Sequence, residues 1–535
     1  MSSVIKDEKF NYLFHLLIEF DKYCCNHDID VMLDRGTLLG AIRHRGFIPW
    51  DYDLDVSMTW ANYQKLLDAW KHDPLPGREI VNWELYPDYP SFFLRYIDKT
   101  TTEIRRASAW DVAPAGMSLD VFILIPLPVD TEEAKLAQDS YIVYFELMDR
   151  IKLNKRTREK SVLKLMKSCL QEIEQKDNRL EVCERLKAQM LKGVSDPDYT
   201  HYFLTPIGIR KLCIYDRSDA DEFTTIQFEG RFFKAPLDYY HVIRKEYGPG
   251  WRYFPAKADS YPYIENLNIP YSIYMHDYMQ YFEKQQILSD YAALKDAELQ
   301  DLLVHQEASS TIYMLELEVF LARFASFGKA NAYNLENLPE ELGTLFNEYI
   351  SYQISAKPRY WNLWSGLDDS WLEMLLQKLL NKAEYLKASA LLDLRVGAST
   401  KPLSQAVQTK QIRLNRVFDL ATAEDCKDVA LVIELLNEID SLDPLISSSA
   451  VADAARLFLI AEEAEKTGDY AALKMKAEAA LKRFPESPEI MFFLALANRR
   501  CGNEADAIVL VKQIRKTSNN GTLLLRIDDE WGDLL

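Results

Sequence analysis

Residues 36–56 read GTLLGAIRHRGFIPWDYDLDV, the most informative stretch of the chain. A Gly-Thr pair and three basic residues precede three aspartates at alternate positions, Asp51, Asp53 and Asp55. Side chains two residues apart share one face of a strand, so these acids would project together if a strand begins that early. Two carboxylates about 4 Å apart repel by roughly 4 kcal/mol at an effective dielectric of 20. A divalent cation usually compensates, since hard cations prefer carboxylate oxygen; protonation of one acid, or splaying into water, are the alternatives.

A third acid stands in an apolar strand-like segment, Leu119-Asp120-Val121-Phe122-Ile123. An acid in such surroundings is rarely left without a partner. If this segment lies beside the strand that contains Asp53 and Asp55, three carboxylates converge. The alternative is that Asp120 only accepts a hydrogen bond from a backbone amide or an arginine.

The remaining residues of the stretch suit an anionic ligand. Gly36 lets backbone N–H groups approach a phosphate, and Thr37 adds a hydroxyl. Arg43, His44 and Arg45 supply positive charge within the same segment. Clustered donors, a glycine turn and several carboxylates are what metal-assisted phosphoryl transfer requires. A solvated run of surface charge is the simpler alternative.

Outward from this stretch, helix and strand periods alternate through the first 130 residues. Amphipathic helices are expected at about 5–25 and 60–71. Strand-like segments are Val31–Leu33, Leu54–Met58, Glu79–Leu85, Phe92–Ile97, Thr101–Arg105 and Met117–Ile125. This mixture predicts an α/β or α+β domain. A Lys-, Glu- and Leu-rich block at about 131–220 is expected to be a helical insertion, and the chain beyond about 265 is expected to be helical.

The C-terminal part carries an internal repeat, clearest over about 454–520. Ala461 and Ala495 are 34 residues apart, as are Gly468 and Gly502. This is the period of tetratricopeptide (TPR) helix–turn–helix repeats, in which glycine ends the first helix of each pair. An irregular helical bundle is the alternative.

Composition and charge exclude several classes of protein. Hydrophobic residues make up 48% and charged residues 27% of the 535 residues, which excludes global disorder. A net charge of −19 argues against nucleic acid as a partner. The N-terminus has no apolar signal region, and no apolar run is long enough for a transmembrane helix. Seven cysteines without a CxxC pair indicate reduced thiols in a cytoplasmic protein. The histidines have no paired spacing, so a histidine zinc site is not expected.

GTLLGAIRHRGFIPWDYDLDV closely resembles the signature of the LicD family, usually read as GTLLGAvRHxGFIPWDDDiDv. The resemblance continues in SLDVFILIPLP (Ser118–Pro128) and in FEGRFFKAPLDYYHVIRKEYG (Phe228–Gly248). It covers about residues 5–265 and leaves the helical C-terminal half outside. At Tyr52 this chain departs from the family, which typically has an acid there.

The resemblance implies a nucleotidyltransferase fold, shared with fukutin and fukutin-related protein. It also implies transfer of a phospho-alcohol, such as phosphocholine or ribitol phosphate, from a CDP-linked donor to a sugar. The residues that match the family's metal-binding acids, with Mg²⁺ or Mn²⁺ as cofactor, are Asp51, Asp53, Asp55 and Asp120. The matching donor-binding residues are Gly36, Thr37, Arg43, His44 and Arg45. Glu229 of the FEG motif is expected to orient the acceptor or the donor base, or else to pair with Arg231 as a turn residue.

The sequence therefore predicts a catalytic domain at 1–265 and a helical, TPR-like region at 266–535. The expected activity is metal-dependent phospho-alcohol transfer to a cell-surface glycan, such as lipopolysaccharide or teichoic acid. It would take place in the cytoplasm or at the inner membrane face, and the repeats could bind a protein partner. The alternatives are a nucleotidyltransferase that acts on a glycan or protein, and a helical-repeat scaffold with a degenerate transferase domain.

Overall fold

The computed structural model of the protein describes residues 2–86, 93–105, 114–148, 160–176, 178–204, 213–248, 250–254, 263–273 and 403–532, with scattered positions between 372 and 392. The chain divides into two compact units. The first comprises Met1–Glu246 and Asp259–Ile287, and the second Tyr247–Ala258 and Leu288–Leu535. The first unit contains an α/β domain, and the described part of the second is almost entirely helical, as the sequence predicts at this level.

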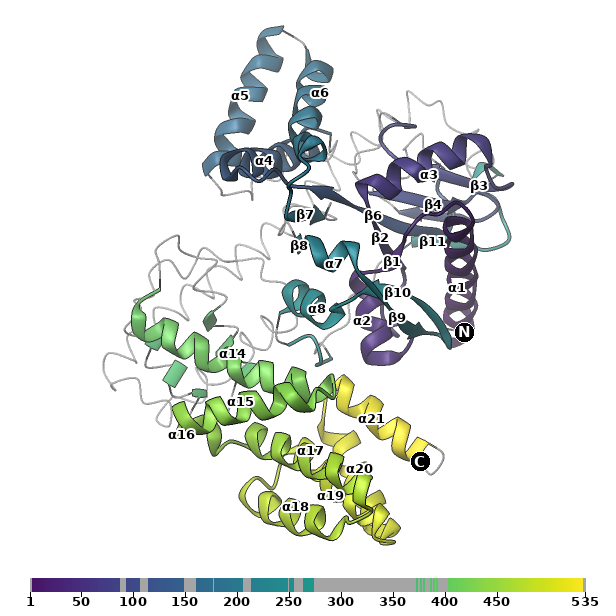
Figure 1. Ribbon diagram of the computed structural model, residues 1–535. Helices are drawn as coiled ribbons and strands as arrows, with labels where there is room; N and C mark the ends of the chain where they lie inside the picture. Colours follow the sequence, from purple (N-terminus) through teal and green to yellow (C-terminus); the bar gives the residue numbers. More distant parts are fainter. Residues whose placement is uncertain are drawn as a thin grey trace, which may run out of the picture. The chain divides into compact units, whose positions relative to one another are not determined.

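A mixed sheet of seven strands forms the centre of the first unit (Figure 1). Its strands are β1 (Met32–Leu33), β2 (Asp55–Thr59), β6 (Ser118–Pro126), β4 (Leu94–Asp98), β3 (Arg78–Val81), β7 (His201–Leu204) and β8 (Cys213–Asp216). β2 runs parallel to β6, and the other pairs are antiparallel. β6 is buried along its whole length, because β2 occupies one edge while β4 and β7 follow one another along the other.

Two helices predicted from the hydrophobic period are confirmed as α1 (Ser2–Asn26) and α3 (Trp60–His72). Both cover the same face of the sheet. The ring of Phe20 from α1 lies 4.9 Å from that of Tyr96 in β4, and the ring of Trp70 from α3 lies 5.9 Å from it. This packing leaves α2 (Arg35–His44), which begins directly after β1, beside β2 and β9.

The helical insertion contains α4 (Thr131–Met148), α5 (Lys160–Lys176), α6 (Arg179–Met190) and a short 3₁₀ helix, Lys192–Ser195. The predicted insertion, about 131–220, also includes β7 and β8, which rejoin the main sheet. These two strands are short, but they bury Tyr202 and Phe203 against β6, so tertiary packing decides their conformation.

Two strand pairs and two helices complete the description of the first unit. β9 (Phe223–Phe228) and β10 (Arg231–Pro236) form a hairpin, and β5 (Thr102–Arg105) pairs with β11 (Tyr263–Asn266). The helices α7 (Arg217–Asp221) and α8 (Tyr239–Tyr247) lie beside β8 (Figure 1).

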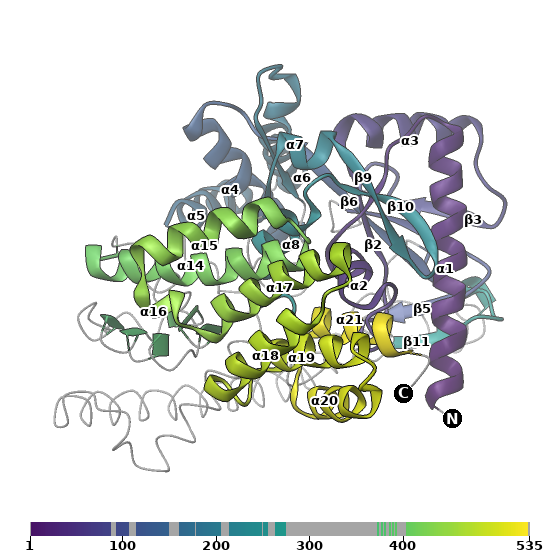
Figure 2. The same cartoon turned by 60° about the horizontal axis from the view of Figure 1, so that its bottom comes forward.

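Among residues 403–532, the helices of the second unit are α14 (Gln405–Asp425), α15 (Val429–Leu442), α16 (Pro444–Ser447), α17 (Ala450–Thr467), α18 (Ala471–Arg483), α19 (Pro488–Arg500), α20 (Glu504–Thr517) and α21 (Gly521–Trp531). Helices α18, α19 and α20 pack side by side (Figure 2). Gly468 ends α17 in a left-handed conformation with φ 76°, and Gly502 follows α19 with φ 82°. These glycines confirm the turn positions predicted from their spacing.

No helix in the described part of the chain is long and apolar enough to cross a membrane.

A short segment of the second unit, within Tyr247–Ala258, packs on the helices of the same unit. Tyr253 forms an isolated β-bridge with Asn520, and the Gly521 amide donates to the Arg252 carbonyl at 2.6 Å. The Arg252 side chain is 6% exposed, and its Nη2 lies 3.0 Å from Asp425 Oδ2 at the end of α14. This buried ion pair anchors the segment to the helices.

Substitution of Arg252 by Met should destabilise the second unit. It leaves the Asp425 carboxylate buried without its counter-charge, which typically costs about 3–5 kcal/mol. We expect faster amide exchange in α14 and α21 and a lower urea midpoint. Arg515→Met is the matched control, because the Arg515–Asp528 pair is exposed and should contribute less than about 1 kcal/mol. Equal effects of the two substitutions would contradict the anchoring role.

Candidate functional site

Three aspartates meet where β2 and β6 run side by side. The parallel register places Asp55 directly opposite Asp120. Asp53 lies in the loop that precedes β2, and carboxylate oxygens of these three residues all lie within 4.8 Å of one another. The strand therefore begins later than alternation along Asp51, Asp53 and Asp55 would require. A loop, not the pleat of a strand, brings Asp53 to the other two acids.

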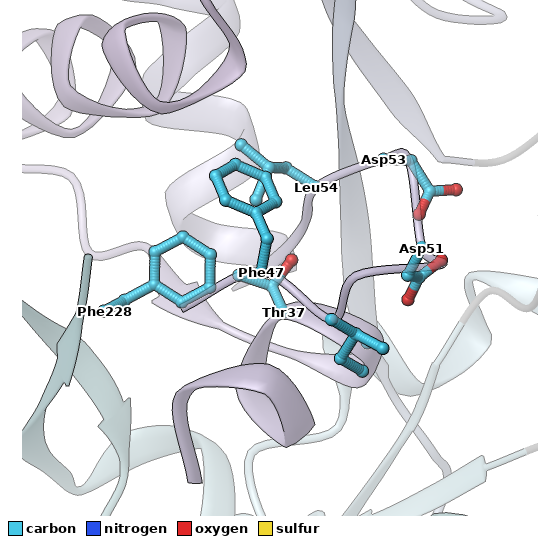
Figure 3. A pocket seen from close by; sticks show the side chains of 8 residues that line it. Thr37, Phe47, Asp51, Asp53, Leu54 and Phe228 are labelled. Carbon is cyan, nitrogen blue, oxygen red and sulfur yellow. The ribbon is translucent and has the colours of Figure 1, made fainter. Parts of the chain in front are cut away.

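Asp51 lies beside this group and lines a small pocket. Asp51 and Asp53 lie at one side of the pocket, and the rings of Phe47 and Phe228 at the other (Figure 3). A Cβ on Gly36 would lie 2.4 Å from Asp51 Oδ2, so only glycine admits Asp51 at this position without a shift. Gly36 and Asp51 are therefore in close contact in the wall of this pocket.

The Gly-Thr pair lies in the first turn of α2 and holds Asp55. The Gly36 amide donates to Asp55 Oδ2 at 3.3 Å, and the Asp55 amide donates to Thr37 Oγ1 at 2.7 Å. The Gly36 amide thus bonds to the Asp55 carboxylate and the Thr37 hydroxyl to the Asp55 backbone amide, while the predicted phosphate contact of this pair stays a prediction. Their observed effect is to fix the position of Asp55.

Asp34 and Arg35 stand directly before this pair. Asp34 caps α2 by accepting from the Arg35 amide at 2.8 Å, and it accepts a second bond from the Tyr215 hydroxyl at 2.7 Å. The Arg35 guanidinium lies 4.2 Å from the centre of the Phe122 ring, and its Nη1 lies 3.4 Å from Glu246 Oε1. Burial alone would lower the pKa of Arg35, but the carboxylates of Glu246, Asp34 and Asp55 raise it, so Arg35 is a fixed positive charge beside the acids.

Asp120 has a cationic partner. Arg95 Nε donates to Asp120 Oδ1 at 3.0 Å from the neighbouring strand β4. Both interpretations of Asp120 therefore hold: it accepts a hydrogen bond from an arginine, and it lies beside two other acids. Asp98, in the same strand as Arg95, pairs with Arg78 of β3, with 2.5 Å between Arg78 Nη1 and Asp98 Oδ2.

The positive charges near the aspartates offset their negative charge only in part. Burial raises the pKa of Asp55 well above its ordinary value, and the carboxylates of Asp53, Asp120 and Asp51 raise it further, against the opposing effect of Arg35. Within the described residues, Asp55 Oδ1 is buried and has no hydrogen-bond partner. Such an oxygen beside two other carboxylates is what a divalent cation would satisfy. The donor set consists of hard oxygen ligands, which suits Mg²⁺ or Mn²⁺.

The predicted basic residues differ in exposure. Arg43 is 5% exposed and Arg45 is exposed, with Arg45 ending α2 in a left-handed conformation of φ 56°. The His44 ring is half-buried and packs edge-on against Trp50, with 5.7 Å between the ring centres. Burial and the charge of Arg43 lower the pKa of His44 to about 4. Near neutral pH, His44 therefore contributes a neutral ring.

Glu229 connects the β9–β10 turn to the loop after α2. Glu229 Oε1 accepts from the Phe47 amide at 3.0 Å, and its own amide donates to the Arg45 carbonyl at 2.7 Å. A Cβ on Gly46 would lie 2.0 Å from Glu229 Oε1, so the contact requires glycine there. The FEG motif and the first motif are thus held together by contacts that sequence reasoning did not foresee.

Tyr52, which stands where the LicD signature has an acid, packs on α1. Its ring is stacked with that of Phe10 at 6.0 Å, and Lys9 Nζ lies 5.8 Å from the ring centre. The departure therefore replaces a charge with an aromatic contact and leaves Asp53 and Asp55 in place.

Two residues that support the site come from late in the chain. Tyr215 and Glu246 reach the site from β8 and α8, about two hundred positions after Asp34 and Arg35. Only tertiary structure brings them to Asp34 and Arg35: Tyr215 lies outside the motifs, and the Phe228–Gly248 motif, which contains Glu246, does not indicate this contact.

The fold and the acids define a class of protein, an α/β protein with a carboxylate site suited to a divalent cation. Residues 28–112 match the LicD family, described as the LicD/FKTN/FKRP nucleotidyltransferase domain, so the chain contains a LicD-family domain. The chain is 26% identical over 260 residues to the lipopolysaccharide cholinephosphotransferase LicD of Haemophilus influenzae, across 46% of this chain and 92% of the relative.

Two shorter matches are to uncharacterized proteins of Rickettsia. The chain is 33% identical over 70 residues to a protein of Rickettsia typhi, which spans 12% of this chain and 23% of the relative. It is 37% identical over 54 residues to a protein of Rickettsia prowazekii, which spans 10% of this chain and 20% of the relative.

The lowered pKa of His44 predicts a pH dependence of stability. Below the ordinary histidine pKa of about 6.5, the unfolded state takes up a proton that the folded state does not take up until about pH 4. Stability therefore falls as pH decreases through this window, by at most about 2 kcal/mol at pH 5. In urea titrations at pH 7.5 and pH 5, His44→Gln should lose less stability than the wild type. His72→Gln, at a side chain that is 78% exposed, should behave like the wild type. An unchanged pH dependence in His44→Gln would contradict the assignment.

Proposed function

We propose that this protein transfers a phospho-alcohol, such as phosphocholine or ribitol phosphate, from a CDP-linked donor to a sugar of a cell-surface glycan. The observation that carries the proposal is the convergence of Asp53, Asp55 and Asp120 in a chain that contains a LicD-family domain. The name of the Haemophilus relative, a lipopolysaccharide cholinephosphotransferase, supports the reaction class and a glycan acceptor.

The acids fit a divalent cation. Asp53, Asp55 and Asp120 would hold Mg²⁺ or Mn²⁺, with Asp51 beside them, and the buried Asp55 Oδ1 would gain a partner. When bound, the ion would neutralise charge on the donor diphosphate and on the departing CMP. Asp55 would then bind in its ionised form, because a cation opposes the burial and repulsion that raise its pKa.

Residues around the acids would position the donor and acceptor. Gly36 and Thr37 hold Asp55, and Glu229 holds the loop at Phe47. Asp120 would act either as a metal ligand or as the base that accepts the proton of the acceptor hydroxyl.

The donor phosphates would be bound by basic side chains of α2. Arg45 is exposed and would contact the donor at the surface, and Arg43 would contribute from its buried position. His44 would serve through its neutral ring, since its pKa is lowered to about 4.

The proposal extends to the fold and to the second unit. The sheet around β2 and β6 would be a nucleotidyltransferase-like core, with residues 1–265 as the catalytic domain and 266–535 as a TPR-like region. The helix pairs α17–α18 and α19–α20, with glycines 34 residues apart in sequence, support repeats of that kind. Such arrays bind proteins or extended ligands, so this region would dock a partner or hold the glycan. The enzyme would act in the cytoplasm, or at the inner membrane face.

The test is metal-dependent CMP release from CDP-choline, CDP-ribitol and CDP-glycerol in the presence of candidate glycans. Asp53→Asn and Asp55→Asn should each reduce release by more than about 100-fold, since each removes a charged metal ligand. Asp68→Asn is the matched control, because Asp68 is exposed on α3 and should leave activity unchanged. Amide exchange should show that all variants keep the fold.

The identity of the transferred group separates the alternatives. CMP release with a phospho-alcohol gained by the acceptor supports the proposal. Incorporation of the nucleotide into a glycan or protein would instead identify a nucleotidyltransferase. Neither product with any donor, and no metal binding by the three acids, would favour a scaffold with a degenerate transferase domain.

A further inference from the structure

A second group of metal-ligating side chains lies at the junction of β8, α7 and α8. Asp216 ends β8, Asp219 lies in α7, and His241 lies in α8. Ligand atoms of these three residues all lie within 4.8 Å of one another. His241 Nε2 lies 3.4 Å from Asp216 Oδ2 and 3.8 Å from Asp219 Oδ2.

These separations are close to those of ligands that share one ion. Bonds of about 2.0–2.2 Å from Zn²⁺ to nitrogen and oxygen place tetrahedral ligand atoms about 3.3–3.5 Å apart. Asp219 is 5% exposed, whereas the Asp216 and His241 side chains are 41% and 47% exposed. The group therefore has a buried floor and an open side, which leaves a fourth position for water.

A fourth residue supports the group from the adjacent strand. His201 Nε2 in β7 lies 3.2 Å from Asp216 Oδ1, the oxygen that does not face His241. The other ring nitrogen of His201 is hydrogen-bonded to Thr200 Oγ1 at 2.8 Å. Metal-binding carboxylates and histidines are commonly oriented by such outer contacts.

The charges around the group leave room for a cation. Lys245 Nζ lies 3.5 Å from Asp216 Oδ2, and the Asp216 amide donates to Asp219 Oδ2 at 3.4 Å. With neutral imidazoles, two carboxylates and one ammonium leave one net negative charge. Lys245 competes with an ion for Asp216, so it should weaken binding without preventing it.

We infer that Asp216, Asp219 and His241 form a structural site for a divalent transition metal, of which Zn²⁺ is the best match. Imidazole with carboxylate favours such a metal over Mg²⁺. The separate spacing of these residues explains why the sequence gives no zinc signal. Asp216 and Asp219 stand 25 and 22 positions before His241, and no zinc-binding motif has this spacing, although His241 itself lies in the Phe228–Gly248 motif.

An ion here would stabilise the elements that support the candidate active site. Tyr215, which bonds Asp34, is the neighbour of Asp216 on β8. Glu246, which pairs with Arg35, follows His241 on α8. Joining β8 to α8 through the ion would fix both contacts, while the acids of the first site remain separate.

The experiment measures Zn²⁺ binding by calorimetry to the full chain after removal of metals with a chelator. A background with Asp53→Asn and Asp55→Asn removes the ligands of the first site. In this background one equivalent of Zn²⁺ should bind and should raise the midpoint of thermal unfolding. His241→Ala and Asp219→Asn should weaken binding by more than about 100-fold, and His201→Ala by about 10-fold.

Two further variants keep the test decisive. Lys245→Met should strengthen Zn²⁺ binding, since it removes the competing ammonium. His72→Ala should leave it unchanged, because His72 and Asp68 form an exposed pair on α3 at 3.9 Å. Binding that is absent, or that is the same in His241→Ala, Asp219→Asn and Lys245→Met as in the background, would overturn the site and show that these contacts are ion pairs only. Neither result depends on whether the enzyme transfers a phospho-alcohol.

Discussion

The pairing of β2 with β6 places two buried carboxylates, Asp55 and Asp120, opposite each other in a parallel register. They are 7% and 1% exposed, so water screens their repulsion poorly. The surrounding contacts stabilise these two carboxylates. Thr37 and Gly36 hold Asp55 through hydrogen bonds, and Arg95 pairs with Asp120 from the next strand. Arg35 supplies a charge that opposes the rise in the pKa of Asp55. Among the described residues, these contacts leave the buried Asp55 Oδ1 without a hydrogen-bond partner, and we propose that a divalent cation binds it.

The same constraint explains how distant segments serve one site. Asp34 is fixed by Tyr215 from β8, and Arg35 by Glu246 from α8. Glu229 fastens the loop after α2 to the β9–β10 turn through the Phe47 amide and the Arg45 carbonyl. The motif at the start of the chain therefore depends on residues about two hundred positions later. The proposed metal site at Asp216 and His241 lies on β8 and α8, the elements that contain Tyr215 and Glu246. A metal ion there would therefore also stabilise the contacts of these two residues with Asp34 and Arg35.

The sequence predicted the helices at α1 and α3, most strands of the sheet and the meeting of three acids, because each depends on a local period or a short motif. It could not place Asp53, because Asp53 lies in a loop that has no period, while the expected strand at Leu54–Met58 agrees with β2 to within one residue. It placed β7 and β8 inside a helical insertion, because packing of Tyr202 and Phe203 against β6 outweighs the local composition. The hydrogen bonds of Gly36 and Thr37 to Asp55 could not be predicted, because they depend on tertiary geometry, and the phosphate contact of this pair stays a prediction. The supporting roles of Tyr215 and Glu246 could not be predicted, because their partners Asp34 and Arg35 lie about two hundred positions earlier in the chain.

The net charge of −19 argues against nucleic acid as a partner. We propose that a divalent cation at Asp53, Asp55 and Asp120 nevertheless lets the protein bind an anionic donor. The most direct test is a crystal of the full chain grown with Mn²⁺ and a non-hydrolysable CDP-choline analogue, examined by anomalous diffraction. The account predicts a manganese peak bound by Asp53, Asp55 and Asp120, with the diphosphate of the analogue on its open side. A nucleotide bound elsewhere, or no manganese at these three carboxylates, would contradict it.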